Sequence, residues 1–276
     1  MRFLKRLYHL IQAKKRFGQN FLKDATIKEK IIQAMPRDDL PVVEIGPGLG
    51  DLTRELIRAQ KHVTAFEIDL ELCGYLQDNF KTEITSDRLE LVCSDVMEAW
   101  SSKTLRDEAY HLIANLPYYV ATNIILRALE DPRCHTIVVM IQKEVAEKFA
   151  ARSGEKSFSA LSVLANSISN AQILFDVGPE CFNPPPKVTS AVLKLEKVKN
   201  FTDDDLFGNE ERLDAFKEFL RAAFRQPRKM LIKNLQERFA KEQLLEQFAK
   251  LEIPQNARPH QLETSNYHLL FKNLNK

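Results

Sequence analysis

Short apolar runs alternate with segments of helical periodicity from about residue 40 to residue 200. This alternation predicts a mostly parallel sheet with helices on both faces, since strands that are buried on both sides read as continuous apolar runs. Helices are expected over Leu52–Ala59, Thr122–Leu129 and Ser157–Ser169. No helical segment separates the last two strands, which favours an antiparallel pair at one edge. The predicted strands are Pro41–Ile45, His62–Ile68, Leu89–Ser94, His111–Leu116, Thr136–Ile141, Ile173–Val177 and Thr189–Leu195.

The pattern changes after Lys199. Phe201–Asn209 is acidic and rich in turn residues, and the sequence beyond it has helical periodicity only. We therefore predict an α/β domain over residues 1–200 and a small helical domain over residues 201–276. Pro227 is expected to end the first helix of the second domain. The apolar stripe of that helix is Leu213, Phe216, Leu220 and Phe224.

Composition adds little to this picture. The chain has 276 residues, of which 44% are hydrophobic and 28% charged, and these values are ordinary for a soluble globular protein. The formal net charge of +2 neither favours nor excludes a nucleic-acid partner. Basic residues are unevenly distributed, however, because the stretch from Arg2 to Lys30 is rich in them and its only acids are Asp24 and Glu29. A second basic cluster consists of Arg221, Arg225, Arg228, Lys229 and Lys233.

The cysteines suggest neither a metal site nor a disulfide framework. They form no C-x-x-C pair, and the six histidines do not cluster with them. Reduced thiols in a cytoplasmic protein are expected, and no apolar run has the length of a signal peptide core or a membrane span. The cysteines are Cys73, Cys93, Cys134 and Cys181.

A glycine-rich loop follows the first predicted strand. Val42–Ile45 leads directly into Gly46–Gly50, and an amphipathic helix follows. Glycine allows the backbone to turn sharply and to pass close to a ligand. Glu67 lies at the end of the second strand, where a carboxylate can accept hydrogen bonds from both hydroxyls of a ribose. These features indicate a nucleoside cofactor.

The identity of that cofactor is narrowed by the spacing of the glycines. They follow G-x-G-x-G, and no feature specific to a pyrophosphate is present. S-adenosylmethionine is therefore favoured over a dinucleotide. Asp95, after the third strand, is positioned to accept from an adenine amine, although an ordinary helix N-cap would explain it equally well.

The fourth strand ends in Asn115-Leu116-Pro117-Tyr118. Doubly wound folds bind ligands at this edge of the sheet. An aromatic amine is a poor nucleophile because its lone pair is delocalised into the ring, and two acceptors aimed at its N–H bonds would make it more tetrahedral. The side-chain oxygen of Asn115 and the carbonyl of Leu116 can be those acceptors, with Pro117 fixing the backbone. Tyr118 can stack on the base, whereas a strand-ending turn with a core tyrosine is the alternative.

A second aromatic wall is predicted at Phe182. The residue precedes Asn183 and three consecutive prolines, which form a stiff extended segment. A base that is flipped out of its stack needs stacking on both faces, so Phe182 is expected opposite Tyr118. The alternative is a rigid loop with a buried phenylalanine.

Four motifs together resemble the ribosomal RNA adenine N6,N6-dimethyltransferase family, in particular its bacterial small-subunit (16S) members. In family order they are Phe17–Leu22, Glu44–Gly50, Asn115–Tyr118 and Phe182–Val192. The resemblance implies a Rossmann-like S-adenosylmethionine-dependent methyltransferase fold with a seven-stranded, mostly parallel sheet and a helical carboxy-terminal domain. It implies dimethylation of two adjacent adenosines near the 3′ end of the 16S RNA during assembly of the small ribosomal subunit, by a monomer.

The resemblance also implies which residues form the sites. Its catalytic residues correspond to Asn115, Leu116, Pro117, Tyr118 and Phe182. Its cofactor residues correspond to Gln19, Asn20 and Leu22 at the methionine end, together with Gly46, Gly48, Glu67, Ile68, Asp95, Val96 and Asn115. Contacts to RNA phosphates are expected from Arg16, Lys187, Arg221, Arg225, Arg228 and Lys229.

The chain departs from the family pattern at three positions. Pro227 replaces a usual basic residue, Met230 a usual threonine and Tyr119 a common asparagine. Two other functions remain open from the sequence. One is adenine methylation of large-subunit RNA by a resistance-type enzyme, and the other is a non-catalytic RNA-binding assembly factor. The intact Asn115, Tyr118, Glu67 and Asp95 argue against the second.

Overall fold

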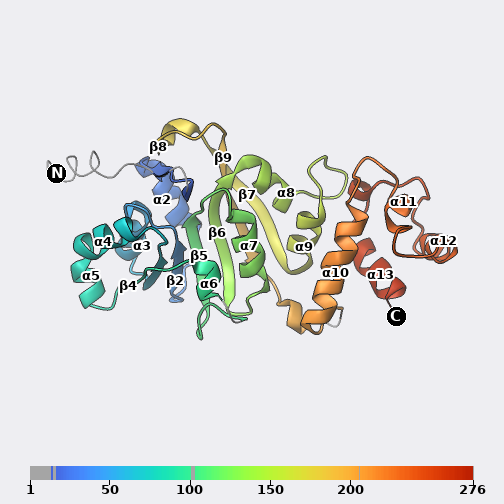
Figure 1. The fold of residues 1–276 in the computed structure, drawn as a ribbon, viewed down its shortest axis with the longest axis horizontal. Helices are drawn as coiled ribbons and strands as arrows, with labels where there is room; N and C mark the ends of the chain where they lie inside the picture. The colour runs from blue at the N-terminus through green and yellow to red at the C-terminus, as the bar shows by residue number, and fades with distance from the viewer. Residues whose placement is uncertain (1–13, 15–16, 101–102, 205, 276) are drawn as a thin grey trace. The chain divides into compact units, whose positions relative to one another are not determined.

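The computed structural model describes residues 14, 17–100, 103–204 and 206–275. Within them the main sheet has seven strands in the order β4-β3-β2-β5-β6-β9-β7 (Figure 1). The pairs β2·β3, β3·β4, β2·β5 and β5·β6 are parallel. The α/β class and all seven predicted strands are therefore confirmed. The strands are β2 (Val42–Ile45), β3 (Val63–Phe66), β4 (Leu89–Val92), β5 (Tyr110–Asn115), β6 (Cys134–Gln142), β7 (Ser169–Val177) and β9 (Ser190–Lys197).

Helices follow most of these strands, as the alternation predicts. β2, β3 and β4 are fully or partly buried along most of their length, so their apolar runs are explained by cover on both faces. The intervening helices are α2 (Ala25–Ala34), α3 (Asp51–Arg58), α4 (Leu70–Asn79), α5 (Lys81–Thr85), α6 (Val96–Ala99), α7 (Ala121–Glu130), α8 (Lys143–Ala150) and α9 (Ala160–Ile168).

The start of α3 is fixed by Gly50. This residue is the N-cap of the helix and has a φ of 75°, in the left-handed region that favours glycine. A Cβ atom there would lie 2.4 Å from Cε2 of Phe80, which is fully buried. Glycine is therefore required at this position by both backbone conformation and space, which keeps the preceding loop close to the sheet edge.

The amino-terminal segment joins the fold through a second, very small sheet. β1 (Phe21–Leu22) pairs antiparallel with β8 (Phe182–Asn183). Leu22 and Phe182 are both buried and belong to one hydrophobic cluster with residues of α2 and α3. This pairing attaches the segment before α2 to a segment that follows β7, far along the chain. Sequence periodicity does not predict it.

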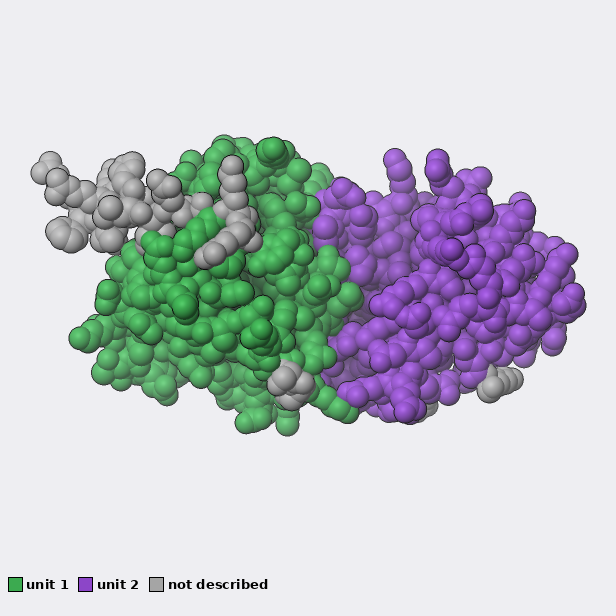
Figure 2. All heavy atoms as spheres, in the orientation of Figure 1, with its two compact units in different colours: residues 1–128, 133–143, 174–192 green, residues 129–132, 144–173, 193–276 purple. Residues whose placement is uncertain are grey.

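Two compact units divide the chain (Figure 2). The first comprises residues 1–128, 133–143 and 174–192, and the second comprises residues 129–132, 144–173 and 193–276. The second unit therefore includes α8 and α9 as well as the carboxy-terminal helices. The proposed domain boundary at residue 200 stays a prediction.

The carboxy-terminal part of the second unit is helical, as expected. It contains α10 (Glu210–Ala223), α11 (Leu231–Leu235), α12 (Lys241–Lys250) and α13 (Thr264–Leu274). The predicted apolar stripe of α10 is largely confirmed, since Leu213, Phe216 and Leu220 are buried. The helix ends before Phe224, earlier than Pro227 requires. An aromatic cluster around Phe216 includes Phe207, Phe219 and Phe271.

The prediction of four reduced thiols is wrong for one pair. Cys73 on α4 and Cys93 after β4 form a disulfide, with their Cα atoms 6.0 Å apart. The sequence does not reveal the pair, because the two cysteines are 20 residues apart and become neighbours only when α4 folds back beside the sheet. Cys134 and Cys181 are buried thiols. Within the described residues, no helix is both long and apolar enough to cross a bilayer.

Candidate active site

A cavity opens at the carboxyl ends of the parallel strands. Its walls come from the loops that follow β2, β3, β4 and β5 and from the amino-terminal segment 17–22. Doubly wound sheets bind ligands at this edge. All predicted cofactor residues line it, namely Gln19, Asn20, Leu22, Gly46, Gly48, Glu67, Ile68, Asp95, Val96 and Asn115. Leu116, Pro117 and Tyr118 of the predicted catalytic set line the same cavity.

The glycine loop forms one wall of the cavity. Gly48 has a φ of 60°, and a Cβ atom there would lie 3.0 Å from Cδ1 of Phe21. The backbone therefore passes as close to the amino-terminal segment as a glycine permits. The Gly48 amide donates a hydrogen bond of 3.2 Å to Oε2 of Glu67, which links this loop to the end of β3.

Glu67 is a buried carboxylate of the cavity, with 4% of its surface exposed. Burial raises its pKa, and hydrogen bonds from the backbone amides of Asp69 and Gly48 act in the opposite direction. The Asp69 amide lies 2.9 Å from Oε1. Each carboxylate oxygen therefore has a backbone donor and keeps further acceptor capacity, which is what two ribose hydroxyls require.

Asp95 is a helix N-cap, which is one of the two roles that the sequence allowed for it. Its Oδ1 accepts from the Met97 amide at 2.8 Å and begins α6. The residue also lines the cavity, so its second oxygen can serve a ligand amine. Ile68, 40% exposed, and the buried Val96 add apolar surface to this part of the cavity. Together these residues fit the nucleoside portion of S-adenosylmethionine.

Asn115 ends β5 with its amide held in place. Nδ2 donates to the backbone oxygen of Asn20 at 3.1 Å, so the donor end of the amide is used by the chain. The remaining end, Oδ1, is an acceptor suited to an amine. Leu116 is buried, and its amide donates to the Met140 oxygen at 3.1 Å, which fixes the strand end on β6.

Tyr118 is half-buried and tethered. Its hydroxyl lies 2.6 Å from Oγ of the fully buried Ser190, at the start of β9. Burial raises the pKa of Tyr118, so the phenol stays neutral at physiological pH. The next residue, Tyr119, is 63% exposed at the rim, and its Cδ1 would lie 3.4 Å from a Cβ on Gly18.

Phe182 does not form the expected second wall in this structure. Only 1% of its surface is exposed, and its ring packs in the hydrophobic cluster that includes Leu22 and Val177. The pairing of β8 with β1 turns this side chain inward. The buried alternative considered from the sequence is therefore the one observed. The aromatic residues that line the cavity with Tyr118 are Tyr119, Phe17, Phe21 and Phe66.

The predicted RNA-binding residues are distributed over the two units. Arg16 lies outside the described residues. Lys187 belongs to the first unit, and the other four belong to the second. Arg221 is paired with Glu218 and Arg225 with Glu237. The contacts of the predicted residues with RNA stay predictions.

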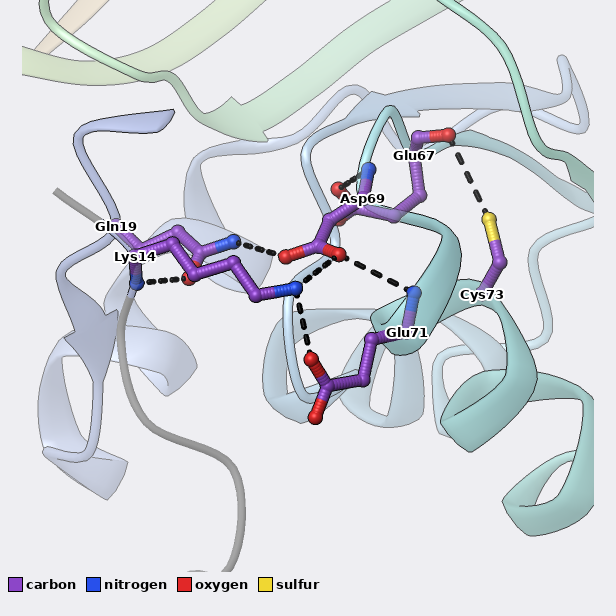
Figure 3. Close-up of polar contacts among 6 residues, drawn as sticks. All are labelled: Lys14, Gln19, Glu67, Asp69, Glu71 and Cys73. Carbon is purple, nitrogen blue, oxygen red and sulfur yellow. Dashed lines mark hydrogen bonds and ion pairs between the residues drawn. The ribbon is translucent and has the colours of Figure 1, made fainter. Parts of the chain in front are cut away.

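Two features of the site were missed from the sequence. Asp69, quoted only as a neighbour of Glu67, binds both Lys14 and Gln19 (Figure 3). Glu44, within β2, is buried and accepts from Oγ1 of Thr53 at 2.6 Å. The sequence could have indicated Glu44, because it is an acidic residue inside an otherwise apolar strand. For Asp69, the only indication in the sequence was its position two residues after Glu67.

Comparisons with known proteins place the chain in a family. Residues 10–276 match the model of the family described as ribosomal RNA adenine dimethylase. This chain belongs to that family. It is 50% identical over 262 residues to the ribosomal RNA small subunit methyltransferase A of Sulfurimonas denitrificans, covering 95% of this chain and 94% of that protein. It is 45% identical to the protein of that name from Campylobacter jejuni, covering 96% of each.

Solved structures share the fold. The crystal structure of a dimethyladenosine transferase from Plasmodium falciparum matches with a TM-score of 0.71 at 24% identity, covering 91% of this chain and 96% of that one. The 23S rRNA methyltransferase ErmE matches with a TM-score of 0.70 at 24% identity, covering 93% of this chain and all of that one. The Rossmann-like methyltransferase fold is thus confirmed. As a member of the adenine dimethylase family, the chain is an S-adenosylmethionine-dependent methyltransferase of ribosomal RNA.

Proposed function

We propose that this enzyme transfers methyl groups to N6 of two adjacent adenosines in a hairpin loop near the 3′ end of 16S ribosomal RNA. One observation carries the proposal: Asn115–Tyr118 and the loop after β2 line the same cavity as Glu67. The site proposed for the methyl donor therefore lies next to the turn proposed to bind the target amine. The names of relatives that are about half identical over nearly the whole chain support the small subunit as the target.

The cofactor site is assigned to the residues around Glu67. Its two carboxylate oxygens are assigned to the ribose hydroxyls, and Asp95 to the adenine amine. Ile68 and Val96 would flank the purine. Gln19, Asn20 and Leu22 are assigned to the methionine end, where the segment 17–22 lines the cavity, and Gly46 and Asn115 complete the site. When bound, S-adenosylmethionine supplies an electrophilic methyl group.

The remaining chemistry belongs to the turn after β5. Oδ1 of Asn115 and the carbonyl of Leu116 accept hydrogen bonds from the two N–H groups of the target amine. The lone pair of the amine nitrogen is then free for attack. Tyr118, held by Ser190, stacks on the extruded base. No strong base is needed, because the amine proton becomes acidic once the methyl group has transferred. Orientation of such a displacement can contribute about 7 to 11 kcal/mol.

Basic residues hold the RNA. We assign phosphate contacts to Arg16, Lys187, Arg221, Arg225, Arg228 and Lys229, with residues 201–276 as a helical RNA-binding domain. The enzyme is proposed to act as a monomer in the cytoplasm, on the small subunit or its precursor.

The test is methylation of purified ribosomal subunits. The protein is incubated with labelled S-adenosylmethionine and with either small or large subunits that lack adenine methylation, and modified positions are mapped by mass spectrometry. Two neighbouring N6,N6-dimethyladenosines in 16S RNA are expected. Methylation of 23S RNA would instead identify a resistance-type activity. Cofactor binding without methylation of either subunit would identify a non-catalytic assembly factor.

A further inference from the structure

Asp69 connects the amino-terminal segment with the end of β3 (Figure 3). Only 3% of its surface is exposed. Its Oδ1 accepts a hydrogen bond of 2.7 Å from the ammonium of Lys14, and its Oδ2 accepts one of 3.0 Å from Nε2 of Gln19. Its own backbone amide donates to Glu67 at 2.9 Å. One buried residue therefore contacts both the amino-terminal segment and the carboxylate assigned to the ribose.

The amide of Gln19 is held at both ends. Its nitrogen donates to Asp69, and its oxygen accepts from the Lys14 backbone amide at 2.8 Å. The Lys14 ammonium also reaches Glu71 at 2.7 Å. Both ends of the Gln19 side-chain amide thus form hydrogen bonds with other residues of this chain, although the family resemblance assigns Gln19 to the cofactor. Its position is that of a clasp beside the cavity that it lines.

Electrostatics favour the closed arrangement. Burial alone would raise the pKa of Asp69, but the hydrogen bonds from Lys14 and Gln19 hold it below its ordinary value. Asp69 also lies close enough to Glu67 for its charge to raise the pKa of that carboxyl. The Lys14 ammonium therefore compensates a second negative charge beside the cavity, and opening the clasp would remove the hydrogen bonds that hold the pKa of Asp69 down.

We propose that Asp69 is a positioning residue, which clasps the segment 17–22 over the cofactor cavity through Gln19 and Lys14. This inference rests on the proposed cofactor site. Each methyl transfer consumes one cofactor, so dimethylation requires the cavity to open between transfers. The exposed side of the clasp suits such a cycle, because the side chains of Lys14 and Glu71 are 29% and 56% exposed and their ion pair is weakened by salt.

The test compares Asp69→Asn and Lys14→Met in the full-length protein. Asn caps helices as well as Asp does, so Asp69→Asn keeps the start of α4, while it removes both the charge that holds Lys14 and the oxygen that accepts from Gln19. Both variants are expected to raise the Kd for S-adenosylmethionine about tenfold by calorimetry. They should raise KM for the cofactor similarly, with kcat at saturating cofactor within about threefold. The matched control is Asp78→Asn, an exposed acid on the same helix.

Hydrogen exchange supplies a readout that needs no activity. In the cofactor-free protein, Asp69→Asn should speed exchange of the amides in residues 17–22 and leave those of α4 protected. The double variant should bind the cofactor no more weakly than Asp69→Asn alone, since that substitution already removes the interaction between Asp69 and Lys14. An unchanged Kd in both single variants, or a fall in kcat at unchanged Kd, would overturn the clasp. If the unaltered protein itself does not bind S-adenosylmethionine, the proposed cofactor site is contradicted, and not the clasp.

Discussion

Two buried carboxylates near the cavity differ in what surrounds them. Both Glu67 and Glu44 line the cavity, and Glu67 accepts from two backbone amides. Glu44 accepts from the hydroxyl of Thr53, and burial raises its pKa to about 8, with the charges of Glu67 and Asp51 adding to the effect. At neutral pH Glu44 is therefore mostly protonated, whereas backbone hydrogen bonds to Glu67 oppose the rise in pKa that burial causes there.

The protonation of Glu44 predicts a pH dependence of stability. Because the folded-state pKa is raised from an ordinary value of 4.5 to about 8, its stabilising contribution is complete below about pH 4.5 and is lost as pH rises toward 8. The slope is at most about 1.4 kcal/mol per pH unit. Glu44→Gln should remove this slope, so the variant gains stability relative to wild type as pH rises through that window. Urea unfolding at several pH values measures it, with Glu29→Gln on the surface as the control.

Gly50 supports a prediction at the level of one helix. Gly50→Ala forces a left-handed residue to carry a Cβ atom 2.4 Å from Phe80. Strain and displacement of the ring should together destabilise the protein by about 2 to 4 kcal/mol. Gly74→Ala is the matched control, because Gly74 lies within α4 and nothing lies within 4 Å of the added atom. It should stabilise by about 0.5 to 1 kcal/mol. Equal thermal shifts for the two variants would contradict the role assigned to Gly50.

The elements differ in how well the sequence predicts them. The seven long strands follow from their apolar runs, and the glycine loop and Asn115–Tyr118 follow from where those strands end. β1 and β8 are very short, and they pair although most of the main sheet lies between them in sequence, so no local pattern reveals them. Phe182 was misplaced for that reason, since the pairing turns its ring into the core. The Asp69 clasp was missed similarly, because its partners Lys14 and Gln19 are remote from it in sequence.

At the scale of the whole molecule, RNA affinity should depend on the basic cluster of the second unit. Arg221→Glu combined with Arg228→Glu is expected to weaken binding to small subunits about tenfold or more at physiological salt, and to make binding less dependent on salt. Cofactor affinity should not change, because neither residue lines the cavity. Filter binding at several salt concentrations measures the effect. Binding that is unchanged at physiological salt would remove these arginines from the interface.

The proposed mechanism requires the turn after β5 to grip the target amine beside the methyl donor. The direct measurement compares cofactor binding with methyl transfer in Asn115→Ala. Loss of the bond to Asn20 should raise the Kd for S-adenosylmethionine by less than about tenfold. Loss of the acceptor should lower the single-turnover rate of methyl transfer to small subunits by about a hundredfold or more. Full dimethylation of both adenosines at an unchanged rate would contradict this role of Asn115.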